Sequence, residues 1–75
     1  MSKPLTRVLV WQVGEDEAFV VRVRESRPQV MRRWGALSDF PDPALAFLEF
    51  TDVDGDLWVF RVDSIRVMCA ERVHS

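Results

Sequence analysis

The feature that most constrains the fold is an Asp-Gly turn between two apolar runs, in the stretch AFLEFTDVDGDLWVFRV of residues 46–62. In an antiparallel hairpin the loop length sets the register, and the register decides which side chains share a face. A two-residue loop, Asp54-Gly55, gives two faces that both mix apolar with polar side chains. A three-residue loop, residues 53–55, places Gly55 in the left-handed position of a bulge and separates the two kinds of side chain.

The three-residue loop is the register that we predict, because a half-buried antiparallel pair needs one apolar face. Its turn chemistry is also favourable, with Asp52 at the first position and Gly55 at the fourth. The inner face then pairs Phe50 with Trp58, Leu48 with Phe60 and Ala46 with Val62. The outer face pairs Thr51 with Leu57, Glu49 with Val59 and Phe47 with Arg61.

Two β-branched, apolar runs precede this hairpin: residues 5–13, LTRVLVWQV, and residues 18–25, AFVVRVRE. The first is apolar on both phases, which is typical of a central strand, and the second is its returning partner. The loop between them has no residue that selects one turn type, so two registers stay open. These are Val10 opposite Val21 with a four-residue loop, and Trp11 opposite Phe19 with a loop one residue shorter.

A short helix is predicted near residues 27–37. Ser26 is a good N-cap, Gln29 three residues later completes a capping box, and Pro28 occupies the first turn. Gly35 weakens this prediction, because it either lowers the stability of the helix or ends it early. The apolar stripe has helical spacing and consists of Val30, Trp34 and Leu37.

The alternation of apolar residues shifts by one position at Asp63-Ser64: apolar residues have even numbers up to Val62 and odd numbers from Ile65 onward. The chain must bend there to keep both runs facing inward, and residues 65–73 form a last strand. The fold class is therefore α+β and mostly β, with about five antiparallel strands in a strongly bent sheet or small open barrel and one short helix. We expect one small domain over residues 1–75, with residues 1–4 frayed.

Chemical function is not indicated by any motif. The acidic turn resembles a calcium loop, but placing Gly55 at the sixth position puts Phe50 at the first and Arg61 at the twelfth, so we expect no metal. His74 is the only histidine, and Cys69 follows the apolar phase of Ile65, so Cys69 is expected to be a small buried hydrophobe. We predict that the protein is not an enzyme and needs no cofactor.

Composition limits the location of the chain. A single cysteine excludes an internal disulfide and suits a reducing compartment, and no apolar run is long enough to cross a membrane. We therefore expect a cytoplasmic protein without a membrane partner.

The leading hypothesis is a protein–protein interaction or self-assembly module that works through an apolar sheet face or a strand edge. Three tryptophans and five phenylalanines are more aromatic side chains than a core of this size is expected to bury. The apolar side chains on the outer face of the main hairpin would also be exposed unless another surface packs against them. The expected partner is another protein or a second copy, as in a homo-oligomer. The candidate interface residues are Phe47, Leu57, Val59, Trp11 and Trp34.

The alternative hypothesis is a nucleic-acid-binding accessory domain. Residues 22–33 contain five arginines and one glutamate, a net charge of +4, and a neighbouring tryptophan could stack on a base. Against this reading, the whole chain is acidic and residues 38–56 carry six negative charges. The candidate basic patch consists of Arg22, Arg24, Arg27, Arg32 and Arg33.

Overall fold

The structure, a computed structural model, describes residues 5–73. Its strands are antiparallel and form a three-stranded sheet in the order β2-β1-β5 and a separate two-stranded sheet of β3 and β4. The predicted fold class is confirmed: a small, mostly-β α+β fold with one helix, in which the described strands do not close a barrel. The elements are β1 (Leu5–Gln12), β2 (Phe19–Val23), α1 (Arg27–Ser38), β3 (Phe47–Thr51), β4 (Leu57–Arg61) and β5 (Ile65–Val73), with 3-10 turns η1 (Pro43–Leu45) and η2 (Val62–Ser64).

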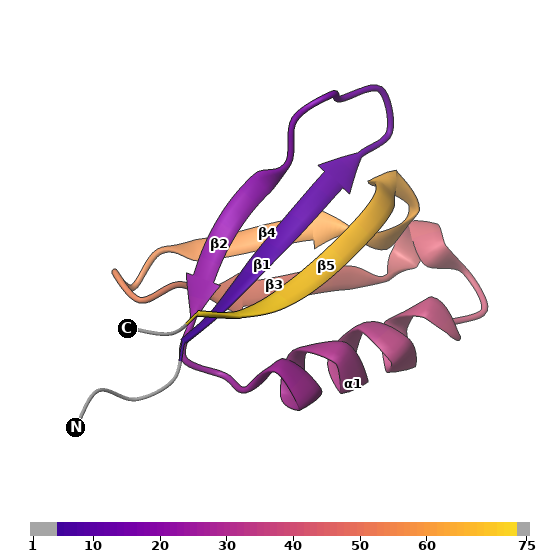
Figure 1. Cartoon of the computed structure of the whole chain (residues 1–75). Helices are drawn as coiled ribbons and strands as arrows, with labels where there is room; N and C mark the ends of the chain where they lie inside the picture. Colours follow the sequence, from indigo (N-terminus) through magenta and orange to yellow (C-terminus); the bar gives the residue numbers. More distant parts are fainter. Residues whose placement is uncertain (1–4, 74–75) are drawn as a thin grey trace.

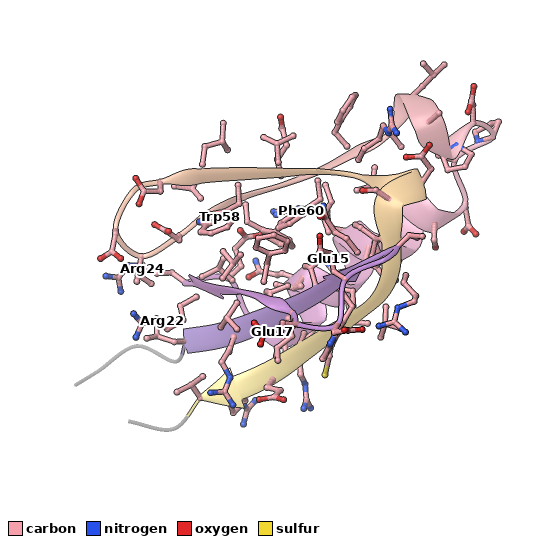
Figure 2. All side chains as sticks on the ribbon, turned by 90° about the horizontal axis from the view of Figure 1, so that it is seen from above. Glu15, Glu17, Arg22, Arg24, Trp58 and Phe60 are labelled. Atoms are coloured by element: carbon pink, nitrogen blue, oxygen red, sulfur yellow. The ribbon has the colours of Figure 1, made fainter. Side chains whose placement is uncertain are left out.

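The core lies between the two sheets, with α1 running beneath both of them (Figure 1). On the opposite side, near β2 and β4, Trp58 and Phe60 lie between the two sheets (Figure 2) and contact Phe19 at ring-centroid distances of 6.3 and 6.0 Å. The residues 1–4 expected to fray, and His74, lie outside the described residues. The buried core cluster consists of Val8, Val10, Val21, Val23, Val30, Leu48, Phe50 and Phe60.

The main hairpin has the predicted register, with five pairs from Phe47 opposite Arg61 to Thr51 opposite Leu57. The bulge is also confirmed, because Gly55 has a φ of 90°, in the left-handed region. Asp52 organises the turn: its carboxylate accepts hydrogen bonds from the backbone N–H groups of Asp54 and Asp56, both at 2.9 Å. Local turn chemistry and alternation were sufficient to define this element.

The first hairpin has neither of the two registers left open by the sequence. Val10 pairs with Phe19 and Val8 with Val21, so the loop spans residues 13–18 and is longer than either alternative. A contact outside the hairpin contributes, because the backbone N–H of Val13 donates to the carbonyl of Ser64 at 2.8 Å. The shift relative to the four-residue loop is two residues along β2, so the side chains keep their predicted faces.

The helix begins with the predicted capping box. The backbone N–H of Ser26 donates to the side-chain carbonyl of Gln29 at 2.8 Å, and the backbone N–H of Gln29 donates to the Ser26 hydroxyl at 3.3 Å. Val30 is fully buried, and Trp34 and Leu37 pack against the core. The helix continues through the glycine that was expected to weaken it. No helix within residues 5–73 is long and apolar enough to cross a membrane.

The predicted bend at Asp63-Ser64 exists as the 3-10 turn η2, but the expected faces of β5 are wrong beyond Ile65. Met68 and Ala70 pack on the core, whereas Val67 is exposed and Cys69 is only half-buried. The cause is a register irregularity beside the Trp11–Gln12 step of β1, where the pairing shifts by one residue. That irregularity reverses the phase after Ile65, so Cys69 is not the buried hydrophobe that the sequence indicated.

Candidate functional site

Three of the five candidate interface residues share the outer face of the β3–β4 hairpin. Phe47, Leu57 and Val59 are 52%, 64% and 48% exposed, because the residues that alternate with them fill the core. They are interspersed with the polar side chains of Glu49, Thr51 and Arg61, which come from the same two strands. No described element packs over this face, so it is a half-apolar surface open to solvent.

The two remaining candidates lie elsewhere. Trp34 packs against the core from α1, so it belongs to the interior and not to the hairpin face. Trp11 is half-buried on the outer face of the three-stranded sheet, where it pairs with the exposed Val67. The structure therefore brings together Phe47, Leu57 and Val59 but separates them from the tryptophans.

A second apolar face lies on the three-stranded sheet, and Trp11 is the one residue of this face among the five predicted interface residues. Leu9 lies between Val20 on β2 and Cys69 on β5, and Trp11 continues this face toward Val67. The signal for it was present, since residues 5–13 are apolar on both phases. We read that pattern as a central strand, and β1 is the central strand of its sheet, but the described residues cover only one of its two faces.

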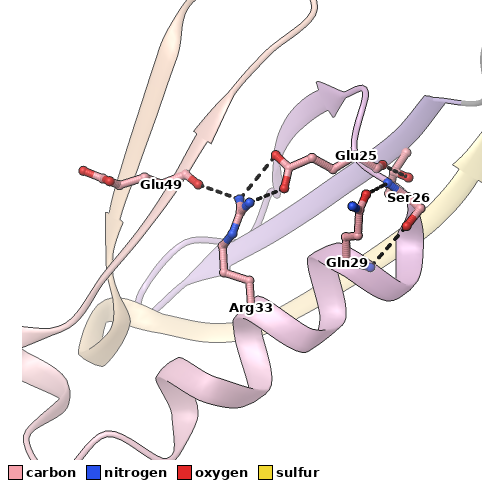
Figure 3. Close-up of polar contacts among 6 residues, drawn as sticks. Glu25, Ser26, Gln29, Arg33 and Glu49 are labelled. Carbon is pink, nitrogen blue, oxygen red and sulfur yellow. Dashed lines mark hydrogen bonds and ion pairs between the residues drawn. The ribbon is translucent and has the colours of Figure 1, made fainter.

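The five arginines do not form one free patch. The guanidinium of Arg33 pairs with the carboxylate of Glu25 and donates to the backbone carbonyl of Glu49 at 3.0 Å (Figure 3). It also lies 5.4 Å from the ring centroid of Phe50. Arg27 and Arg32 are exposed on α1, whereas Arg22 and Arg24 lie on β2 or just after it. Arg33 thus serves to join α1 to β3.

A groove of about 500 Å³ lies between α1 and β3, where the sequence predicted no site. Its polar part is the Arg33–Glu25 ion pair, and its apolar part includes Leu37 and the exposed Phe47. The groove depends on how the helix packs beside the strand, a tertiary feature without a local signal. The residues that line it are Glu25, Arg33, Ala36, Leu37, Phe47, Glu49 and Thr51.

The acidic turn has a structural role. The indole N–H of Trp58 donates to the Asp52 carboxylate at 2.8 Å, and this bond, with those from the backbone N–H groups of the turn, holds the pKa of Asp52 below its usual value. The partners of the carboxylate all belong to the hairpin itself. Among residues 5–73 no three histidine, cysteine or acidic side chains gather as metal ligands.

No protein-family model matches the chain, and comparisons with curated proteins and with solved structures find no significant match either.

Proposed function

We propose that the protein is a small, non-catalytic protein-interaction or self-assembly module that acts through the apolar surface of the β3–β4 hairpin. The observation that carries this proposal is the position of Phe47, Leu57 and Val59, each about half exposed on one face. Exposed apolar side chains that share one face and are rimmed by polar residues are a mark of interaction sites. Because it has a single cysteine, we place the module in the cytoplasm.

The nucleic-acid alternative gains no specific support from the geometry. The guanidinium of Arg33 is already bound to Glu25 and Glu49, and Trp34, the aromatic that would stack on a base, packs against the core. An interface for single-stranded nucleic acid needs free cations beside exposed aromatic rings. The hairpin face offers exposed apolar side chains with one arginine, Arg61, whose guanidinium pairs with Asp63, and this favours a protein surface.

The proposal is tested by photocrosslinking in the cells that produce the protein. A photoreactive residue in place of Leu57 is expected to give discrete adducts with one protein, either another chain or a second copy of this one. The same residue in place of Arg32, exposed on α1, is the control and is expected to give none. Equal labelling from both positions, or no adduct from position 57, would refute an interaction through the hairpin.

A further inference from the structure

The edges of the two sheets differ in how well their backbone groups are satisfied. Among the strands of residues 5–73, only β1 has a neighbour on both sides, so β2, β5, β3 and β4 are all edge strands. An edge strand directs half of its N–H and C=O groups away from its sheet, where another strand can bind them. Which of these edges is free therefore decides where a second chain could add.

Three of the four edges are occupied or guarded. On β2 the carbonyl of Arg22 accepts from the N–H of Val53 at 2.9 Å, and on β3 the carbonyl of Glu49 accepts from the Arg33 side chain at 3.0 Å. The strand β5 packs against α1 and carries the exposed charges of Arg66 and Arg72. Charged side chains and covering elements are common ways to block pairing at an edge.

The edge of β4 is protected only at its end, where the carbonyl of Arg61 accepts from the Ser64 hydroxyl at 2.7 Å and the exposed Arg61 side chain pairs with Asp63. The N–H of Val62 donates to the carbonyl of Ala46 at 2.9 Å, so the even-numbered residues of this strand bond to β3. The backbone groups of Leu57 and Val59 consequently point away from β3, and none of the hydrogen bonds within the described chain engages them. Residues 57–60, Leu-Trp-Val-Phe, contain no charge and have high β propensity.

We propose that a second copy of the chain adds to this edge, so that two β4 strands pair antiparallel about a two-fold axis at Val59. This inference rests on the proposed function and names its partner and its geometry. The axis sets Val59 opposite the partner's Val59 and Trp58 opposite the partner's Phe60. The result is a continuous four-stranded sheet, and a two-fold contact of this kind closes on itself.

Complementarity of the aromatic side chains favours a second copy as the occupant. Trp58 and Phe60 stack at 6.3 Å within the chain, and with Phe19 they lie on the side of the molecule toward β2 and β4 (Figure 2). Phe19 is 41% exposed, and Trp58 is only partly buried. Pairing about Val59 extends this cluster across the axis, and aromatic pairs are among the favourable cross-strand neighbours.

Charge selects the antiparallel orientation. The turn beside β4 carries Asp52, Asp54 and Asp56 and contains no basic residue. Parallel pairing would bring two such turns together, whereas antiparallel pairing puts them at opposite ends of the new sheet. It also sets Arg61 opposite the partner's Leu57, where its aliphatic stem can cover that exposed side chain.

The dimer is expected to be weak. Pairing along a five-residue strand covers less surface than the roughly 1,200 Å² that a stable interface buries. We therefore expect a Kd of about 10 μM to 1 mM. Sedimentation equilibrium up to millimolar concentration is expected to show a mass that rises from 8.7 kDa toward twice that value.

Two variants separate edge pairing from packing of the outer faces. Val59→Pro removes an N–H that points away from β3, so the hairpin keeps its own ladder while the dimer is lost. Phe47→Ser changes the outer face on β3, far from the β4 edge, and is expected to leave dimerisation unchanged. The reverse result, dimer loss in Phe47→Ser but not in Val59→Pro, would overturn the edge geometry.

Crosslinking tests the register without depending on the proline variant. In a Cys69→Ser background, Val59→Cys places two thiols on paired residues with Cα atoms about 5.5 Å apart. Leu57→Cys, the matched control, places them four residue steps apart, about 14 Å. With a thiol crosslinker too short to bridge the second pair, dimers are expected from Val59→Cys alone.

The failure of this inference is distinguishable from the failure of the proposed function. A wild-type chain that stays at 8.7 kDa to millimolar concentration, or equal crosslinking from both cysteine positions, refutes pairing about Val59. Photocrosslinking from position 57 to another protein would in that case still support the interaction module. Circular dichroism and thermal unfolding of each variant confirm that the compared chains are folded.

Discussion

Replacing a glycine by alanine is expected to have opposite effects on stability at two positions of this chain. Gly55 has a φ of 90°, whereas Gly35 lies within α1, and a Cβ at either position meets no atom within 4 Å from the rest of the fold, outside the adjoining residues and the backbone of α1 itself. Steric clash is therefore absent at both positions, and only backbone conformation distinguishes them. The pair isolates the strain of a left-handed residue from every other effect of an added methyl group.

The magnitudes follow from the two backbone conformations. At Gly55, alanine costs roughly 1–2 kcal/mol in the left-handed region, and the lower entropy of the unfolded chain returns roughly 0.4–1 kcal/mol. The net loss for Gly55→Ala is about 1 kcal/mol, which lowers the Tm by about 4–8 °C in a domain of this size. At Gly35, alanine improves helix propensity and is expected to stabilise by roughly 0.5–1 kcal/mol.

Urea unfolding followed by tryptophan fluorescence measures both variants. The midpoint should fall for Gly55→Ala and rise for Gly35→Ala at an unchanged slope, since neither change alters the surface exposed on unfolding. Measurements at low micromolar concentration keep the chain monomeric, so that association does not contribute to the midpoint. A midpoint for Gly55→Ala at or above that of the wild type would mean that the three-residue loop is not the native turn.

Three further substitutions test the helix, the core and the acidic turn. Ser26→Ala removes the capping hydroxyl and should lower the free energy of unfolding by about 1 kcal/mol in the same urea assay. Leu48→Ala removes a fully buried side chain between the sheets and should cost about 2–5 kcal/mol, read as a drop in the Tm. Asp52→Asn tests pH dependence: because the folded pKa of Asp52 is lowered, its contribution is present above the ordinary pKa of about 4 and is lost as the pH falls through the folded value. The acid-side decline in Tm should therefore be shallower in Asp52→Asn than in the wild type, and parallel pH profiles would contradict the role assigned to this carboxylate.

The elements that could be predicted from the sequence are those with local determinants. The register of the main hairpin follows from Asp52, Gly55 and the alternation of the flanking strands, all within about 17 residues. The helix start follows from the side chains of Ser26 and Gln29. In both cases the hydrogen bonds that define the element are made by residues close in sequence, so the pattern contains the information.

The features that could not be predicted depend on contacts between distant segments. The first loop is held by a bond from Val13 to Ser64, and the phase of β5 is reversed by an irregularity beside Trp11. The groove between α1 and β3 depends on the position of Arg33, whose partners Glu25 and Glu49 come from two other segments. No periodicity or spacing within one segment specifies such contacts.

The core is complete without the side chains of the hairpin's outer face. All the fully buried side chains come from the inner faces of the two sheets and from α1, and Leu57 and Val59 contribute to none of that packing. Polar residues with high β propensity, such as threonine, would also be compatible with a strand at these two positions. They would also make pairing of this edge with another chain less favourable. Folding stability therefore does not account for the apolar side chains of Leu57 and Val59 on β4, whereas association through that strand does.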